Sequence, residues 1–219
     1  MKYNYSFRRT LSVLVLLMAS TLTWAWDFKI DGIYYNIASY TSVKVAFGSY
    51  SGDVIIPSEV TYRDKTYSVT GTDWYAFGGC SITSVEIPSS LTSIGRQAFE
   101  RCTYLTSINI PDGVTDIEWG AFWDCSSLTS IDIPNSVTSI GKYTFRNCSS
   151  LTTVICRAKK VPKLERTAFY NVPQSEATLY VPASALKKYK AAYGWKNFGT
   201  ILPIEGNEDI INGKKVMLR

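Results

Sequence analysis

Residues 91–111, with the sequence LTSIGRQAFERCTYLTSINIP, decide the fold because the chain repeats them. Close copies occupy residues 114–134 and 137–156. Each copy carries a phenylalanine, usually after alanine, and these rings recur about every 23 residues, a period typical of solenoids. The recurring rings are Phe77, Phe99, Phe122, Phe145 and Phe169. The repeat therefore predicts a solenoid, in which each unit buries its apolar edge only against its neighbours.

Within one unit, the apolar positions recur in kind from copy to copy, so their side chains are expected to point inward and stack. In the unit quoted above they are Leu91, Ile94, Ala98, Phe99, Cys102, Leu105, Ile108 and Ile110. Ile108 and Ile110 alternate with Asn109, which predicts a strand that presents Asn109 outward. The segment from Arg96 to Cys102 is too short for a full helix and predicts one or two helical turns.

The segments on either side of the repeats, which span 69–182, are expected to close the ends of the solenoid. Residues 26–68 are rich in β-forming side chains and predict an N-terminal β cap, with a hairpin within Thr61–Tyr67. Residues 183–206 predict a C-terminal cap with a helix over Ala185–Tyr193. The polar tail, 207–219, is either disordered or a hairpin that turns at Asn212-Gly213.

The N-terminus, residues 1–25, has the pattern of a secretory signal peptide. Basic residues precede an apolar run, Leu11–Leu22, and Thr23-Trp24-Ala25 offers a cleavage site after Ala25. An uncleaved anchor is the alternative, but the run is short for a membrane span. We expect an exported protein, at the cell surface, secreted or in the periplasm, without membrane insertion after cleavage.

The charge of the chain gives no reason to expect a nucleic-acid partner. The formal net charge is +5, and three of the cations, Lys2, Arg8 and Arg9, belong to the signal peptide. The mature chain is therefore nearly neutral, and it has no Lys/Arg cluster of the kind that binds nucleic acid.

Four cysteines share one column of the repeat, three residues after the phenylalanine: Cys80, Cys102, Cys125 and Cys148. Val172 fills this position in the next unit, and Cys156 occupies a strand position that isoleucine fills elsewhere. Cysteine that alternates with Val and Ile behaves as a small buried hydrophobe. Stacked parallel side chains also reach the dihedral angle of a disulfide with difficulty. We therefore expect free core thiols.

The sequence predicts a protein that is not an enzyme and that needs no cofactor or metal. The chain has no histidine, which excludes Ser-His-Asp and Cys-His catalysis. It has no CxxC pair for a metal and no glycine-rich phosphate loop. Glu86 and Asp132 share an outward column, but Asn109 separates them, so they are expected about 10 Å apart and solvated.

Two outward surfaces are candidates for ligand binding. On the turn side, Trp and Arg residues, which are common in binding hot spots, occupy adjacent variable columns. Those chosen are Trp74, Arg96, Trp119, Trp123 and Arg146. Stacking of these side chains on one another is the alternative. The second surface is the strand column with Glu86, Asn109, Asp132 and Ile155, flanked by Ser84, Ser107, Ser130 and Thr153, which solvation alone also explains.

The repeat unit in 91–111 and its copies resemble the BspA-like bacterial leucine-rich repeats. The C-terminal ATLYVPASALKKYKAAYGWKNFGTI in 177–201 and the N-terminal DFKIDGIYYNI in 27–37 are similar to the ends of these proteins. The resemblance implies a leucine-rich-repeat solenoid, mainly β, a right-handed coil with short helical turns, an N-terminal β cap and a C-terminal capping helix. It also implies a surface or secreted protein of host-associated bacteria.

Founding members of that family are similar to adhesins that bind extracellular-matrix proteins. We therefore expect adhesion to, or binding of, a host or cell-surface macromolecule by a monomer. One alternative is a carbohydrate-binding module in which Trp74, Trp119 and Trp123 stack on sugars. The other alternative is a structural envelope protein without a dedicated ligand.

Overall fold

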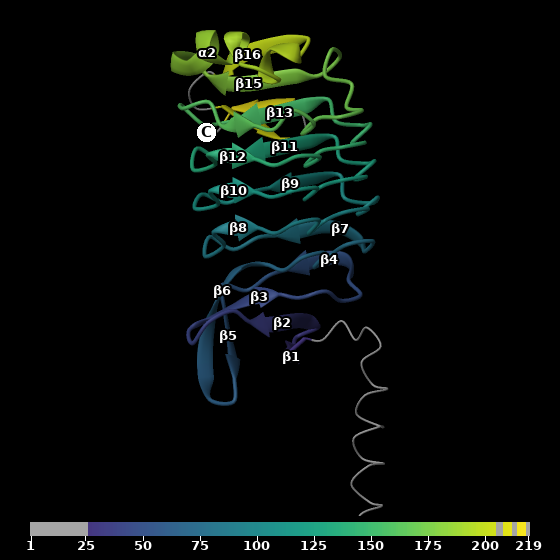
Figure 1. The fold of residues 1–219 in the computed structure, drawn as a ribbon, viewed down its shortest axis with the longest axis vertical. Coiled ribbons are helices and arrows are strands. Elements are labelled where there is room, and N and C mark those ends of the chain that lie inside the picture. Colours follow the sequence, from purple (N-terminus) through teal and green to yellow (C-terminus); the bar gives the residue numbers. More distant parts are fainter. Residues whose placement is uncertain (1–25, 205–207, 212–213, 218–219) are drawn as a thin grey trace, which may run out of the picture.

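The computed structural model describes residues 26–204, 208–211 and 214–217, so the predicted signal peptide lies outside the described residues. The chain winds into a mainly β solenoid of about seven turns, and each turn lies on the one before it (Figure 1). This is the fold that the repeat predicted. The two strands of a typical coil belong to different sheets, one along each side of the stack.

The first sheet has nine strands and runs from the N-terminal end through the repeats. Its members are β1 (Phe28–Ile30), β2 (Ile33–Ile37), β3 (Ser42–Val45), β5 (Glu59–Tyr62), β6 (Lys65–Thr72), β8 (Ser93–Ile94), β10 (Asp116–Ile117), β12 (Ser139–Ile140) and β14 (Lys163–Leu164). From β8 to β14 the strands are parallel and only two residues long, with equivalent residues of successive repeats in register.

The second sheet has five parallel strands on the other side of each coil. They are β9 (Ser107–Asn109), β11 (Ser130–Ile133), β13 (Thr153–Cys156), β15 (Thr178–Pro182) and β16 (Thr200–Ile204). A separate parallel pair, β4 (Ser51–Ile55) and β7 (Ser81–Glu86), precedes it. Because β3 and β4 pair in parallel with β6 and β7, coil-like stacking already begins inside the segment 26–68.

The segment between the two strands of a coil does not form the helical turn expected there. In residues 95–102 the backbone makes β-type turns, in which Gln97 and Arg101 have φ angles of 54° and 58°. A right-handed helix requires negative φ at each residue. Alternate backbone N–H groups donate to the next coil, as that of Phe99 does to the Ala121 carbonyl at 2.8 Å, and the N–H groups between them close short turns within the segment. Stacking between coils thus replaces local helical bonding.

The repeat phenylalanines form one continuous column through the core. Successive rings from Phe77 to Phe169 lie between 4.9 and 5.6 Å apart and are nearly parallel, with interplanar angles of 1° to 17°. Tyr50 closes the column at the N-terminal end, and Trp195 and Phe198 close it at the C-terminal end with edge-on contacts. Every coil therefore contributes one ring to a shared apolar core.

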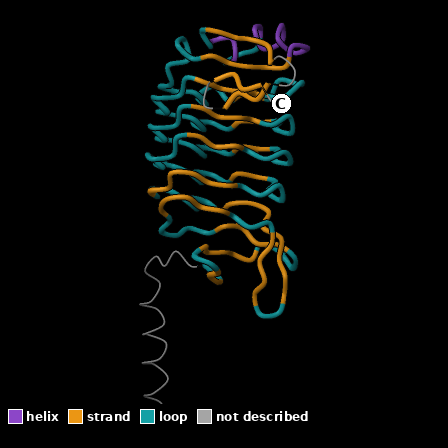
Figure 2. The backbone as a smooth tube through the Cα atoms, turned by 180° about the vertical axis from the view of Figure 1, so that it is seen from behind, coloured by secondary structure: helices purple, strands orange, loops and turns teal. Residues whose placement is uncertain are grey.

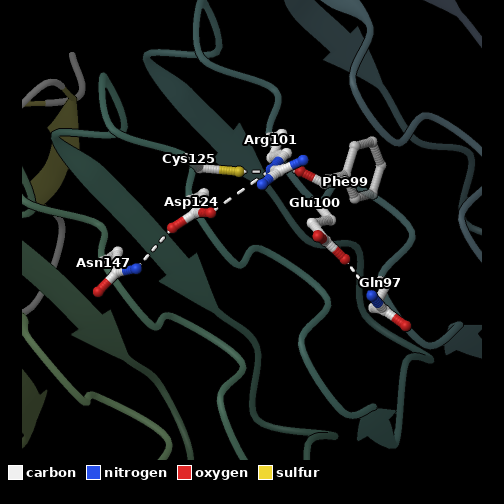
Figure 3. Close-up of polar contacts among 7 residues, drawn as sticks. All are labelled: Gln97, Phe99, Glu100, Arg101, Asp124, Cys125 and Asn147. Carbon is white, nitrogen blue, oxygen red and sulfur yellow. Dashed lines mark hydrogen bonds and ion pairs between the residues drawn. The ribbon is translucent and has the colours of Figure 1, made fainter.

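The cysteine column lies beside the rings, and all five cysteines are buried and free, as predicted. The thiols of Cys102, Cys125 and Cys148 each donate to the carbonyl of the phenylalanine one coil earlier, at 3.0 to 3.1 Å. Figure 3 shows this contact for Cys125 and Phe99. Burial raises the pKa of the Cys148 thiol to about 12 and that of Cys156 to about 11. Burial and the hydrogen bonds to carbonyl groups thus keep the sulfur atoms protonated and unreactive.

A thiol-labelling experiment checks the state of the cysteines. In the native protein at pH 8, a disulfide reagent is expected to label fewer than one thiol per chain within minutes, because the sulfurs are buried and protonated. After denaturation without reductant, all five cysteines should react. Fewer than four reactive thiols in the denatured chain would contradict free core cysteines.

The N-terminal end is closed by antiparallel hairpins. β1 and β2 pair across the turn at Asp31-Gly32, and β5 and β6 pair across a turn at Arg63-Asp64. Arg63 and Asp64 both have positive φ, 50° and 59°, as tight hairpin turns require. The hairpin predicted within Thr61–Tyr67 is thus present, with its tip at Arg63-Asp64.

The C-terminal end is closed by three short helical elements after β15. They are η1 (Ala183–Ala185), α2 (Leu186–Ala191) and η2 (Trp195–Asn197). Tyr189 is buried and its hydroxyl donates to the Ala158 carbonyl at 2.8 Å. Tyr193, expected on the same helical face, is exposed because the helix ends at Ala191.

The described part of the tail consists of two antiparallel strands, β17 (Glu208–Ile211) and β18 (Lys214–Met217). Of the two alternatives for the tail, the strands agree with the hairpin; its predicted turn at Asn212-Gly213 lies outside the described residues. In Figure 2 the hairpin is drawn in front of the upper coils, and in Figure 1 it lies behind them, at the level of β13.

Candidate functional site

Aromatic and cationic side chains of three neighbouring coils gather at one edge of the stack, where the turns between the two sheets lie. We call this group the turn-edge cluster: Trp119, Trp123, Tyr143, Arg146 and Tyr170. Trp119 lies 5.5 Å from Trp123 and 6.2 Å from Tyr143, with nearly perpendicular ring planes. The Trp123 and Tyr143 rings lie 6.0 Å apart. Edge-to-face contacts at these distances are favourable.

Arg146 joins the rings of the cluster. Its guanidinium carbon lies 4.7 Å from the ring centroid of Trp123, 5.2 Å from that of Tyr143 and 5.3 Å from that of Tyr170. The Trp123 indole N–H and the Arg146 Nε–H are buried and have no hydrogen-bond partner. A buried donor without an acceptor costs about 1–3 kcal/mol, so the cluster carries unused hydrogen-bonding capacity.

A ladder of polar side chains runs along the same turns, at the position two residues after each repeat phenylalanine. Arg101, Asp124, Asn147 and Asn171 occupy equivalent positions in successive coils, all with positive φ. Asn147 donates to Asp124 at 2.6 Å, and Asn171 donates to Asn147 at 3.0 Å. Arg101 lies 3.6 Å from the other Asp124 oxygen, and Figure 3 shows the Arg101–Asp124–Asn147 part of this ladder. These bonds hold the turns of neighbouring coils in register.

Of the turn-side residues chosen from the sequence, the structure brings four together. Arg96 lies with its guanidinium carbon 5.7 Å from the Trp119 ring centroid, and Trp119, Trp123 and Arg146 form the cluster itself. Trp74 is 57% exposed and donates its indole N–H to Gln97 at 2.8 Å, two coils away from Trp119. Sequence reasoning missed Tyr143, although it stands two residues before a repeat phenylalanine, as Tyr75 does.

The second candidate surface, on the outer side of the strands β7, β9 and β11, is discontinuous. Glu86 and Asn109 are exposed, but β7 and β9 belong to different sheets. The Asp132 carboxylate is occupied by Arg157 of the next coil, whose Nε and Nη2 atoms lie 2.9 and 2.5 Å from its oxygens. The ion pair with Arg157 accounts for the Asp132 carboxylate as a link between coils, without a ligand.

The expectation that Ile155 faces solvent is wrong, because Ile155 is only 3% exposed. All four residues of β13 are buried, so both faces of this strand are covered. The hairpin β17–β18 lies at the level of β13 in Figures 1 and 2, on the side that faces the viewer in Figure 2. Burial of both faces of one strand cannot be seen in the repeat pattern.

Beside Trp119, a groove of about 490 Å³ crosses the first sheet from β8 to β14. We call it the sheet-side groove. Its floor is formed by the short strands β10 and β12, and its charged and aromatic lining is Arg96, Asp116, Glu118, Trp119, Lys163 and Glu165. Apart from Arg96 and Trp119, the members of this groove were not predicted from the sequence, because they occupy ordinary polar positions of separate repeats.

The fold and its surfaces define the class of protein: a leucine-rich-repeat solenoid closed at both ends. The chain belongs to the BspA-type leucine-rich repeat family, whose model matches residues 72–193 in six copies. A comparison with curated proteins gave no match.

Several solved structures are similar to this chain. A leucine-rich repeat protein of Bacteroides capillosus is 29% identical, with a TM-score of 0.55 over 59% of this chain and 97% of its own. One of T. pallidum is 24% identical, with a TM-score of 0.62 and coverage of 82% and 87%. A leucine-rich cell surface protein of Faecalibacterium prausnitzii is 21% identical, with a TM-score of 0.53, and the match covers 90% of this chain but 59% of that protein.

Proposed function

We propose that this protein is exported and binds a host-cell or matrix protein through the turn-edge cluster, without catalysing a reaction. The observation that carries the proposal is the gathering of two Trp, two Tyr and one Arg from three coils at one edge. Trp, Tyr and Arg are the residues most enriched in binding hot spots. The description of the Faecalibacterium relative as a cell surface protein supports the location.

The arrangement of the rings favours a protein ligand over sugar stacking on all three tryptophans. Trp123 has Arg146 against its ring, and Trp119 is in contact with Trp123 and Tyr143. Trp74 lies apart from both. Trp119 and Trp123 therefore form one half-buried patch, and the three tryptophans are not a row of separate open platforms. The exposed cations Arg96, Lys142 and Arg166 occupy the repeat position of Trp119 in neighbouring coils, which favours a partner surface with carboxylates.

The location of the protein is tested on intact bacteria. Among the described residues, no helix is long and apolar enough to span a bilayer. If the chain is exported to the surface, an added protease should remove it from whole cells while cytoplasmic proteins stay intact. Full protection in intact cells and in cells with a permeabilised outer layer would contradict export.

The binding prediction is tested with the mature chain, residues 26–219, on immobilised matrix proteins and on host cells. Arg146→Ala and Trp123→Ala are each expected to weaken binding about 30-fold or more, as hot-spot truncations of about 2 kcal/mol or more do. Tyr104→Ala is the matched control, because Tyr104 is 60% exposed and is not one of the aromatic residues of the cluster.

A second pair of variants separates binding from folding. Lys142→Glu and Arg166→Glu change exposed side chains, so the thermal midpoint should stay within a few degrees of wild type. Association with an acidic partner should nevertheless slow about tenfold at low salt. Equal binding by wild type, the cluster variants and the charge-reversed variants would overturn the proposal.

A further inference from the structure

The sheet-side groove is built from side chains that the turn-edge cluster does not use, apart from Trp119 at their common border. It crosses four parallel strands, which at about 4.8 Å per strand gives it a length of about 14 Å. Its volume of about 490 Å³ falls within the range of about 300–1,000 Å³ typical of small-molecule sites. The groove is therefore long enough for a ligand of two or three linked rings.

Hydrogen-bond donors and acceptors both line this groove. The acceptors are the carboxylates of Asp116, Glu118 and Glu165, and the donors are Arg96 and Lys163. The hydroxyls of Ser93 and Ser139 can do either. Each of the four coils places at least one of these groups in the groove.

Contacts within the groove hold several of these side chains in place before a ligand arrives. The Ser139 hydroxyl donates to one Asp116 oxygen, and Thr115 donates to the other at 2.8 Å. Lys163 Nζ lies 2.7 Å from Glu165 Oε1. Side chains that are already ordered lose less conformational entropy when a ligand binds.

We infer that the sheet-side groove binds a short neutral oligosaccharide. A sugar hydroxyl both donates and accepts, which suits a lining that contains carboxylates, hydroxyls and cations. The apolar C–H face of a pyranose ring can cover the half-buried Trp119 side chain and remove apolar surface from water. Three carboxylates against two cations disfavour sulfated or acidic sugars, which would bring further negative charge.

An extended peptide fits this groove less well. A peptide that adds to a sheet needs an unpaired strand edge. The floor strand β10 is paired with β8 on one side and with β12 on the other, and β12 is paired with β10 and β14. A ligand in the groove must therefore be held by side chains, as sugars are, and not by the backbone of the floor.

The experiment screens the mature chain against an array of neutral, sulfated and sialylated oligosaccharides, and measures the affinity of the best neutral binder by calorimetry. The double variant Asp116→Asn with Glu118→Gln is expected to weaken that affinity at least tenfold. Asp112→Asn, at an exposed carboxylate outside the groove, should leave it unchanged. Circular dichroism and the thermal midpoint establish that each variant is folded.

The outcomes separate this inference from the protein-binding proposal, on which it does not depend. Arg146→Ala should keep sugar binding, because the Arg146 guanidinium lies against Trp123, Tyr143 and Tyr170 and not against Trp119. The groove variants should keep protein binding. No neutral sugar bound on the array, binding of sulfated or sialylated sugars alone, or an affinity unchanged in folded groove variants would each overturn the inference. Binding of a basic peptide in the groove in place of any sugar would do the same.

Discussion

Replacing Phe122 by alanine is expected to lower the free energy of unfolding by about 3–5 kcal/mol. Phe122 is fully buried and packs between Phe99 at 5.3 Å and Phe145 at 5.6 Å, so alanine leaves a cavity in the middle of the ring column. Each coil touches only its neighbours, so the coils on either side cannot close the gap without losing their hydrogen-bond register. Urea unfolding followed by circular dichroism measures the loss.

The matched control for this variant is Tyr104→Ala, which removes an exposed aromatic ring of the neighbouring coil. Because the Tyr104 side chain is largely in water, its loss should change the stability by no more than about 0.5 kcal/mol. A cost below about 1 kcal/mol for Phe122→Ala would show that the rings do not form one continuous column.

The protein is expected to lose stability steeply above about pH 8.5, where thiols of an unfolded chain begin to ionise. Burial raises the pKa of Cys148 to about 12 and of Cys156 to about 11, and it raises those of Cys102 and Cys125 as well. In this pH range the unfolded chain releases these protons while the native chain keeps them. Stability is therefore complete below pH 8.5 and falls as the pH rises.

The size of this effect follows from the number of buried thiols. Each one that stays protonated in the native state costs about 1.4 kcal/mol per pH unit, so the four fully buried thiols, which exclude Cys80, cost roughly 5 kcal/mol per unit. At this slope, a free energy of unfolding of about 5–15 kcal/mol falls to zero within about 1–3 pH units. Urea titrations under reducing conditions at half-unit steps from pH 7.5 to 10.5 measure the slope.

The control is the double variant Cys125→Ser with Cys148→Ser. Serine keeps a donor for the carbonyls of Phe99 and Phe122 but does not titrate in this range. The slope against pH should then fall to about half, whatever the absolute stability of the variant. Equal slopes for the two proteins, or a stability that is flat up to pH 10.5, would show that the thiols do not control the alkaline transition.

Much of the interior could be read from the sequence because a solenoid stacks equivalent residues on one another. The column of Phe99 and Phe122, the buried cysteines and the alternation around Asn109 all follow from the period. The turn conformation could not be read in the same way. Left-handed backbone at Gln97 and Arg101 is stabilised by hydrogen bonds to the next coil, which local helix propensity does not describe.

The sequence by itself determined the period, the inward columns and the family, because each coil packs against a near copy of itself. Only the tertiary structure decided which outward side chains meet. Trp119, Trp123 and Arg146 come together while Trp74 stands apart, Asp132 is taken up by Arg157, and Ile155 is covered. The physical reason is that an inward side chain meets its own equivalents one strand spacing away. An outward side chain meets whatever the turns, the neighbouring coil and distant segments bring to it.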